Sequence, residues 1–211
     1  MKLKPKSDEL LAEIKIISPD TKIWGLTGGI ASGKSTAAQY LREAGFFVSD
    51  TDQIAADLLE NNDLIKTRLR QELGTDQKDK LREIVFSDDK SRKILESVLH
   101  PAIREESLKQ IKQVIRAHTT NEKPIRAVFI EAALLLETGF FRKLDDTLVI
   151  VCDPTIQRER AIRRNPTHEK WIDRILSSQC DNAFRRESGA KILENNGNLE
   201  PLKHQLLKLI L

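Results

Sequence analysis

The chain has 211 residues, of which 39% are hydrophobic, so it can bury one core that carries inserted subdomains but hardly two independent domains. Its 35 basic and 32 acidic residues leave a net charge of only +3 with no polybasic tract, which argues against a nucleic-acid partner. It has no apolar run of the roughly 18 residues that a membrane helix needs. Cys152 and Cys180 form no C-x-x-C pair, which fits reduced packing residues in a cytoplasmic protein.

Residues 1–21 precede the first expected strand. Leu10, Leu11 and Ile14 recur at helical spacing and predict a short helix with one apolar face. Charged residues take the place of the apolar centre of a signal peptide. We therefore treat 1–21 as an N-terminal extension, whose role the sequence does not indicate.

Short apolar or β-branched segments alternate with helical stretches along the remainder of the chain, which favours an α/β fold with a parallel sheet between helices. The expected strands are Ile23 to Thr27, Phe46 to Ser49, Ile125 to Ile130, Thr147 to Val151 and Lys191 to Leu193. Ligands of such sheets bind at the carboxyl ends of the strands. The segments from Gly28, from Asp50, at Glu131 and at Asp153 all follow strands, so we expect them to share one cleft.

A glycine-rich segment directly after the first strand satisfies the P-loop pattern G-x-x-x-x-G-K-[ST]. Its backbone N–H groups and the following helix, Ser35 to Glu43 with Gly45 as its cap, predict a site for the phosphates of a nucleoside triphosphate such as ATP. Lys34 is expected to reach the β- and γ-phosphates, and the Ser35 hydroxyl to be a ligand of Mg²⁺. The nucleotide-binding residues expected here are Gly29, Ile30, Ala31, Ser32, Gly33, Lys34, Ser35 and Thr36.

Asp50 and Asp52 follow the second strand at a spacing of two, so they project to the same side if the strand continues. Beside a magnesium nucleotide, one carboxylate is able to hold a metal-bound water while the other accepts the proton of an attacking hydroxyl. An alternative is that either aspartate only caps the helix expected at Gln53 to Leu59.

Helices dominate between Gln53 and Thr120, followed by a polar loop at Thr119 to Lys123. The expected helices are Asp63 to Leu73, Lys80 to Phe86, Ser91 to Val98 and Pro101 to His118. Pro101 suits the first turn of a new helix. His100 and Arg104 lie four residues apart and are candidates to contact an anionic second substrate, although a lone histidine is more often structural.

A second helical insert runs from Pro154 to about Phe184, with Asp153 as its N-cap. Its arginines are too dense for a solvated face, because only Glu159 is available nearby as an acidic partner. We expect a lid that closes over the transferring phosphates and excludes water, with several of these arginines in solvent as the alternative. The arginines are Arg158, Arg160, Arg163, Arg164 and Arg174.

Glu131 is expected either to orient Mg²⁺ through water or to form a buried polar pair.

The sequence has no N-K-x-D motif, which argues against a GTPase switch. The P-loop, the Asp50 segment and the two helical inserts together resemble the dephospho-CoA kinase family. The resemblance covers nearly all of residues 23–206. It is carried by G-L-T-G-G-I-A-S-G-K-S-T from Gly25, D-T-D-Q-I-A from Asp50, L-R-E-I-V-F from Leu81, L-H-P-A-I-R from Leu99, A-L-L-L-E-T-G from Ala133, Q-R-E-R-A-I-R-R from Gln157, R-I-L-S-S-Q from Arg174 and E-N-N-G from Glu194.

The resemblance implies ATP-dependent phosphorylation of the ribose 3′-hydroxyl of dephospho-CoA, with Mg²⁺, to give CoA and ADP in the final step of coenzyme A biosynthesis. It implies that the catalytic base is Asp52, beside Lys34 and the lid residue Arg160. Arg164 and the adenine-proximal loop Asn195 to Gly197, with Asn195 and Gly197 as contacts, are implied on the nucleotide side. Asp50, His100 and Arg104 are implied on the acceptor side.

The sequence departs from the family pattern at Ala133 and Leu136, where a proline and a phenylalanine are usual, at Gln77 and Lys78, where an Asp-Arg pair is usual, and at Ala190, where an aspartate is usual. These positions concern the affinity for the acceptor and not the handling of phosphate. The extension 1–21 is longer than the usual start.

We therefore expect a P-loop NTPase three-layer sandwich of the kinase type over residues 22–211. Its parallel-sheet core comprises 22–60, 121–153 and 186–211, its helical substrate insert about 61–120 and its lid about 154–185. We expect small-molecule substrates, no nucleic-acid or membrane partner, and a monomer or weak homo-oligomer. Two alternatives stay open, namely a P-loop kinase for another acceptor, such as a nucleoside monophosphate or a sugar acid, and a non-catalytic ATP-binding regulator.

Overall fold

The computed structural model describes residues 6–118, 125–164, 166, 169–197 and 199–210. The polar loop expected at Thr119 to Lys123 lies outside these ranges. The chain forms two compact units, one of Met1–Asp20 with Asp50–Pro124 and the other of Thr21–Ser49 with Ile125–Leu211. We call them the helical unit and the sheet unit. They divide the chain more coarsely than the core, insert and lid that we expected, and that finer division stays a prediction.

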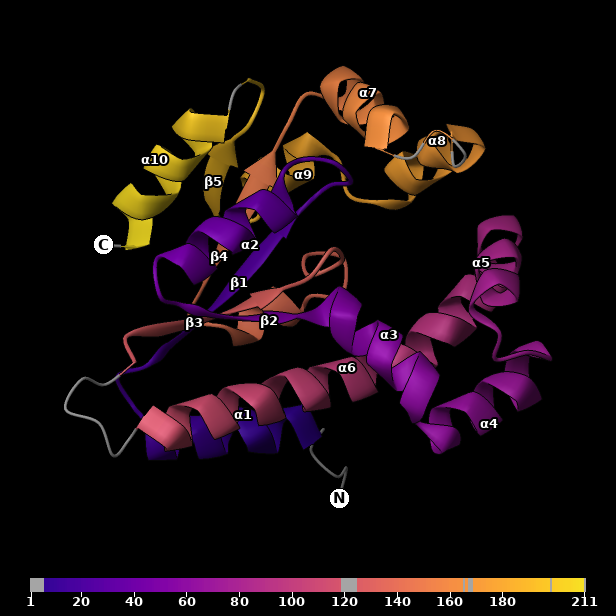
Figure 1. Cartoon of the computed structure of the whole chain (residues 1–211), viewed down its shortest axis with the longest axis horizontal. Coiled ribbons are helices and arrows are strands. Elements are labelled where there is room, and N and C mark those ends of the chain that lie inside the picture. The colour runs from indigo at the N-terminus through magenta and orange to yellow at the C-terminus, as the bar shows by residue number, and fades with distance from the viewer. Residues whose placement is uncertain (1–5, 119–124, 165, 167–168, 198, 211) are drawn as a thin grey trace. The chain divides into compact units, whose positions relative to one another are not determined.

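The sheet unit is built on five strands in the order β2-β3-β1-β4-β5 (Figure 1). The strands are β1 (Lys22–Gly28), β2 (Phe47–Asp50), β3 (Ala127–Glu131), β4 (Asp146–Val151) and β5 (Lys191–Glu194). β1 pairs in parallel with β3 and β4, and β4 pairs in parallel with β5. The five strands expected from the sequence and their parallel arrangement are confirmed, because apolar runs of this length are buried on both faces of the sheet.

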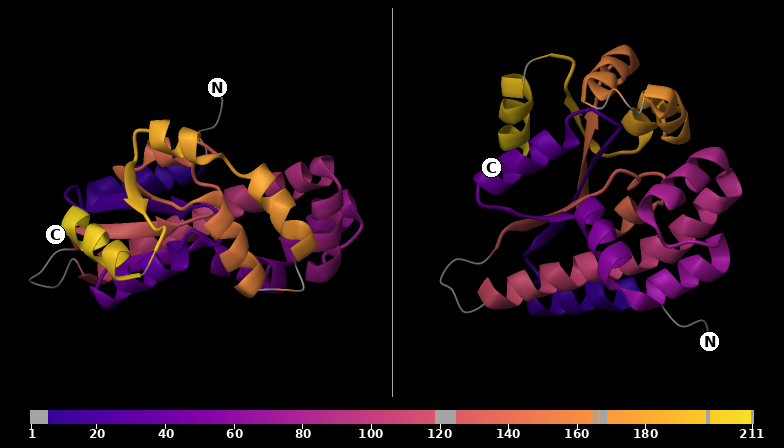
Figure 2. Two further views of the ribbon diagram at one scale, coloured as in Figure 1. Left: turned by 90° about the horizontal axis from the view of Figure 1, so that it is seen from above. Right: turned by 45° about the vertical axis from the view of Figure 1, so that its right-hand side comes forward.

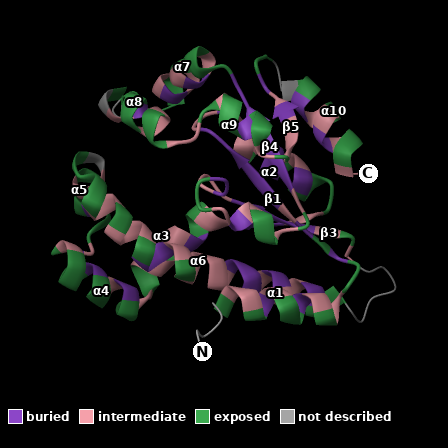
Figure 3. Ribbon diagram, turned by 180° about the vertical axis from the view of Figure 1, so that it is seen from behind, coloured by how far each residue is buried: buried purple, intermediate pink, exposed green. Residues whose placement is uncertain are grey.

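Apolar side chains of alternating strand residues fill the core on both faces of this sheet. Leu148 and Ile150 of β4 join one cluster, which includes Leu202 and Leu206, whereas Val149 and Val151 join another. The first cluster is covered by α2 (Lys34–Glu43) and α10 (Leu199–Ile210), which lie against each other in Figure 1. The central strands are accordingly buried in Figure 3.

The described part of the sheet unit also contains the 3-10 helix η1 (Phe140–Lys143), α7 (Pro154–Arg164), α8 (Glu169–Ser178) and α9 (Asn182–Glu187). The Asp153 carboxylate accepts a hydrogen bond from the Thr155 N–H at 2.8 Å, so it caps the start of α7 as expected. Gly45 follows α2 with φ of 89°. Glycine adopts this left-handed conformation most easily, and it commonly ends a helix.

The helical unit comprises α1 (Lys6–Ile17), α3 (Thr51–Asn61), α4 (Asp63–Leu73), α5 (Lys78–Ser87) and α6 (Asp89–His118). α1 lies along α6 in both views of Figure 2, with Leu10 and Ile14 buried. Ion pairs from Lys6 to Glu105 and from Lys112 to Glu13 flank this contact. The helix expected in the N-terminal extension is therefore confirmed, and it packs on a partner about 99 residues further along the chain.

The expectation that Pro101 starts a new helix is wrong. α6 runs without interruption over 30 residues with Pro101 inside it. Proline removes one backbone donor, but the helix continues because apolar residues on both sides of it are buried against neighbouring helices. Val98 and Leu99 join the cluster with α4 and α5, and Leu108 and Ile111 are fully buried. In the part of the chain that the structure describes, no helix is long and apolar enough to cross a membrane.

Candidate active site

The P-loop connects the end of β1 at Gly28 to the start of α2 at Lys34. Ala31 has φ of 54° and Gly33 has φ of 104°, and these two left-handed residues curl the backbone before the helix. The first helical hydrogen bond of α2 runs from the Ala37 N–H to the Gly33 carbonyl. The N–H groups of the turn before Ala37 therefore have no acceptor within the helix itself. The expected strand, loop and helix are confirmed, and they form a helix N-terminus of the kind that binds anions.

A buried ion pair sits beside this loop. The Lys34 ammonium lies 2.9 Å from a carboxylate oxygen of Glu131 at the end of β3, and the side chain of Glu131 is only 2% exposed. Arg42 of α2 lies 3.5 Å from the other oxygen of that carboxylate. Of the two expectations for Glu131, the buried polar pair is therefore observed. It places the Lys34 ammonium at the carboxyl end of the central strands, where ligands of parallel sheets bind.

The Ser35 side chain is exposed in the first turn of α2. A hydroxyl there suits Mg²⁺, which prefers oxygen ligands and keeps several waters and phosphate oxygens when it arrives with a nucleotide. Among the described residues, no group of three or more histidine, cysteine, aspartate or glutamate side chains is arranged to hold a metal. The Ser35 hydroxyl thus fits a cation whose remaining ligands are waters and phosphate oxygens.

Side chains from other elements hold the outer side of the P-loop. The Gln157 side-chain amide of α7 donates to the Ile30 carbonyl at 3.1 Å, and the Gln179 side-chain oxygen accepts from the Ile30 N–H at 2.8 Å. The Asn195 amide, after β5, donates to the Ser32 carbonyl at 2.6 Å. A Cβ built on Gly29 would lie 2.4 Å from the Gln157 amide nitrogen, so glycine is required there by space.

Arg160 points toward the loop after β5. Its guanidinium donates to the carbonyls of Asn195 and Gly197, each at 2.9 Å. Arg164, in the last turn of α7, is exposed. The structure thus brings Arg160, expected as a catalytic lid residue, together with Asn195 and Gly197, two of the residues expected on the nucleotide side.

The expectation that the α7 arginines lack acidic partners is wrong for Arg158. Its guanidinium lies 2.8 Å from Asp173 and 3.6 Å from Glu169, both on α8. Sequence spacing within one helix does not show partners on the next helix, which is why this pair was missed.

The expectation that Asp50 and Asp52 project from one continued strand is wrong. β2 ends at Asp50 and α3 begins at Thr51. The Asp50 carboxylate accepts from the N–H groups of Asp52 at 2.9 Å and Gln53 at 3.1 Å, so it is the N-cap of α3, as the alternative reading had it. Asp52 is exposed in the first turn of that helix. Both belong to the helical unit, and their approach to the P-loop stays a prediction.

His100 and Arg104 lie one turn apart on α6, and the Arg104 Nε–H donates to the His100 carbonyl at 3.2 Å. Burial is the main cause that lowers the pKa of His100 below its ordinary value of 6.5, with Arg104 contributing in the same direction against Glu96. Burial therefore favours the neutral form of the His100 imidazole. Of this pair, Arg104 carries the positive charge that an anionic acceptor would need.

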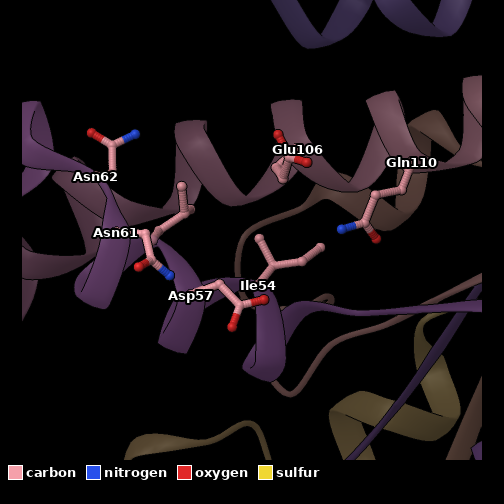
Figure 4. Close-up of a pocket in the computed structure, with 7 residues that line it drawn as sticks. Ile54, Asp57, Asn61, Asn62, Glu106 and Gln110 are labelled. Carbon is pink, nitrogen blue, oxygen red and sulfur yellow. The ribbon is translucent and has the colours of Figure 1, made fainter.

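A pocket of about 250 Å³ opens between α3 and α6 of the helical unit (Figure 4). Two of its polar groups are engaged in local structure, since Asp57 accepts from the Gln53 amide and Asn62 caps α4 through the Ile65 N–H. None of the expected site residues lines it. Its walls are formed by Ile54, Asp57, Leu58, Asn61, Asn62, Glu106 and Gln110.

The two cysteines are free thiols. Burial and the neighbouring Glu137 raise the pKa of Cys180 to about 12. Burial also raises the pKa of Cys152. Neither is a reactive thiolate at neutral pH, in agreement with their expected role as packing residues.

Comparison with known proteins decides the family. The sequence model of CoaE, dephospho-CoA kinase, matches residues 22–201. The chain belongs to the dephospho-CoA kinase family. The reaction of this family is the ATP-dependent phosphorylation of dephospho-CoA, the final step of coenzyme A biosynthesis, so the protein is a kinase of the P-loop fold.

Individual relatives agree with this assignment. The chain is 34% identical to a dephospho-CoA kinase of Fusobacterium nucleatum over 187 residues, which cover 85% of this chain and 92% of that one. A crystal structure from Thermus thermophilus is 31% identical, with a TM-score of 0.70 over 90% of this chain and 96% of that chain. A dephospho-CoA kinase structure from Campylobacter jejuni is 25% identical, with a TM-score of 0.60 over 89% of this chain and 94% of that chain.

Sequence reasoning missed the P-loop contacts of Gln157 and Gln179, and it gave Asn195 a role at the adenine. Gln157 and Gln179 stand in two of the segments that carry the family resemblance, at the start of Q-R-E-R-A-I-R-R and at the end of R-I-L-S-S-Q. The signal available in the sequence was that both glutamines stand inside segments that carry the family resemblance, although neither has a catalytic role.

Proposed function

We propose that this protein transfers the terminal phosphoryl group of ATP to the ribose 3′-hydroxyl of dephospho-CoA. The observation that carries the proposal is the Lys34 ammonium, held 2.9 Å from buried Glu131 beside the N-terminus of α2. A fixed ammonium and a turn of backbone N–H groups stabilise charge on phosphate oxygens without reorganising during the reaction.

We assign the residues on the nucleotide side the following roles. The backbone from Gly29 to Thr36 binds the phosphates, and Lys34 neutralises charge that develops on the transferring group. Ser35 would be the side-chain ligand for Mg²⁺, which would offset negative charge on the nucleotide. Arg164 acts from the lid over the same phosphates. Arg160 fixes the loop after β5 by donating to the carbonyls of Asn195 and Gly197, and the backbone of that loop lies by the adenine.

On the acceptor side, Asp52 takes the proton of the attacking hydroxyl and Asp50 fixes the start of the helix that carries it. Phosphoryl transfer needs orientation and charge neutralisation more than a strong base, so an exposed carboxylate suffices. Arg104 pairs with an anionic group of dephospho-CoA, and His100 contributes a neutral imidazole to that contact. We expect a protein of the cytoplasm that acts on small molecules.

The acceptor is tested by measuring ADP release with dephospho-CoA, AMP and gluconate in parallel, at saturating ATP and magnesium. Of the three acceptors, we expect only dephospho-CoA to support turnover. Turnover only with AMP or gluconate would assign the chain to another small-molecule kinase. ATP binding without turnover on any of the three would favour a regulatory nucleotide-binding protein.

A further inference from the structure

Two side chains hold carbonyl groups on the outer side of the P-loop. The Gln157 amide donates to the Ile30 carbonyl at 3.1 Å and the Asn195 amide to the Ser32 carbonyl at 2.6 Å. Gln157 is 3% exposed and Asn195 is 2% exposed, so both bonds are shielded from water. Buried bonds of this kind fix the orientation of the groups that they join.

The orientation of a carbonyl fixes that of the next N–H. A trans peptide is planar, and its C=O and N–H bonds point in opposite directions. All peptide bonds that the structure describes are trans. The Ile30 carbonyl therefore sets the direction of the Ala31 N–H, and the Ser32 carbonyl sets that of the Gly33 N–H. Both N–H groups point away from the side chain that holds the carbonyl.

We propose that Gln157 and Asn195 are positioning residues that aim the amides of Ala31 and Gly33 at the phosphates of the triphosphate. The inference deepens the proposed function and rests on it, because it assigns the outer support of the same phosphate-binding loop. It places the role of the Asn195 side chain in phosphate binding and not in recognition of the base.

The positions involved leave the loop little freedom to turn its peptides. The N–H of Ile30 is held by Gln179, so that residue is gripped on both its N–H and its C=O. Ala31 and Gly33 are the two left-handed residues of the loop, where peptide planes turn most sharply. A Cβ on Gly33 would lie 2.2 Å from the Asn195 amide nitrogen, so the amide packs directly on the backbone that it orients.

Arg160 supports this arrangement from behind. Its guanidinium donates to the backbone carbonyl of Asn195 at 2.9 Å, and the Asn195 N–H donates to the Val151 carbonyl of β4 at 2.9 Å. The Asn195 backbone is thus fixed on both sides, and its side chain has a defined direction from which to hold the P-loop.

The test compares Gln157→Met and Asn195→Leu with a matched control, Gln205→Met. Gln205 is also a glutamine in the sheet unit, and its amide bridges the N–H and C=O of Glu194 without touching the P-loop. For each folded variant, calorimetry measures binding of inorganic tripolyphosphate, ATP and GTP with magnesium present, and kcat is measured with dephospho-CoA.

We expect both loop variants to bind tripolyphosphate, ATP and GTP about tenfold more weakly, with an unchanged ratio of ATP to GTP affinity, and to lose at least about tenfold in kcat. The control retains the binding of wild type. If Gln157→Met does not give a cooperative thermal melt, the isosteric Gln157→Glu is used in its place. In the same way Asn195→Asp is used in place of Asn195→Leu. Both isosteric variants remove the donor and keep the shape.

Unchanged tripolyphosphate binding in folded loop variants would overturn the inference, and so would a loss confined to ATP, which would assign Asn195 to the adenine. Wild-type protein that does not bind tripolyphosphate would overturn it as well. Wild-type protein that binds tripolyphosphate but does not phosphorylate dephospho-CoA would contradict the proposed function and leave the loop assignment standing.

Discussion

The sheet unit and the helical unit present their candidate residues in different ways. Lys34 and Glu131 of the sheet unit are 11% and 2% exposed, and they are joined to each other. Asp52 of the helical unit is exposed in the first turn of a helix. The ion pair proposed to act on phosphate is therefore part of a packed core, whereas the expected base is at a surface position. Substitutions should affect folding and activity together in the first case and separately in the second.

The largest effect is expected from Lys34→Met. Loss of the ammonium should lower kcat about 10³-fold, because one fixed charge at the transferring phosphate is removed. The buried Glu131 carboxylate then loses its shorter ion pair and keeps the longer one with Arg42, so the melting temperature should fall as well.

The double variant Lys34→Met with Glu131→Gln separates these two consequences. It removes the buried charge together with its partner, so thermal stability should recover while kcat stays low. Lys203→Met is the matched control, because Lys203 lies over the Tyr40 ring away from the ion pair. Recovery of kcat in the double variant would contradict the assigned role of Lys34.

A packing change in the helical unit tests whether the two units are energetically separate. Leu69 of α4 is fully buried, and Leu69→Ala should lower the free energy of unfolding by about 2 to 5 kcal/mol. Binding of ATP at low temperature should be retained, since every contact to the P-loop described above comes from the sheet unit. Leu64 of the same helix is 84% exposed, and Leu64→Ala is the control with a change below about 0.5 kcal/mol.

Asp52→Asn is expected to lower kcat about 10²-fold, within the usual range for loss of a general base, while the KM for ATP stays nearly constant. Steady-state kinetics with both substrates varied gives the two values. Glu60→Gln, at an exposed position of the same helix, should leave both unchanged. A raised KM for ATP with unchanged kcat would remove Asp52 from the chemical step.

The smallest effect concerns the Glu13–Lys112 pair between α1 and α6. Lys112 lowers the pKa of Glu13 below its ordinary value of 4.5. A carboxyl whose folded pKa is depressed contributes stability above its unfolded pKa and loses it as the pH falls through the folded value. Glu13→Gln should therefore melt slightly below wild type at pH 6, and this difference should disappear as the pH falls through the depressed folded pKa of Glu13. Glu9→Gln, at an exposed position of α1, should show no such pH-dependent difference.

Local patterns predicted the fold well. α4 has the bounds expected from apolar periodicity, Asp63–Leu73, and the P-loop was evident because its function depends on consecutive residues. The pattern failed where tertiary packing overrides a local preference. Pro101 indicates a helix start in isolation, yet it lies inside α6 because the residues on both sides are buried.

Long-range partners were the other limit. Gln179 and Ile30 are 149 positions apart, and Arg158 meets Asp173 on a separate helix. Single-sequence spacing carries no information about which distant side chain meets a given backbone group. Asp50 and Asp52 show a local limit, because spacing does not indicate which of two neighbouring carboxylates caps the helix until the end of β2 is located at Asp50.

The packing of α1 on α6 has a consequence for synthesis. Lys6 and Glu105 are 99 positions apart, so the apolar side of α1 leaves the ribosome long before the helix that covers it. At about 5 to 20 residues per second, that interval lasts roughly 5 to 20 s. Throughout it Leu10 and Ile14 lack the helix that finally covers them, which makes the nascent N-terminal segment a candidate for chaperone capture.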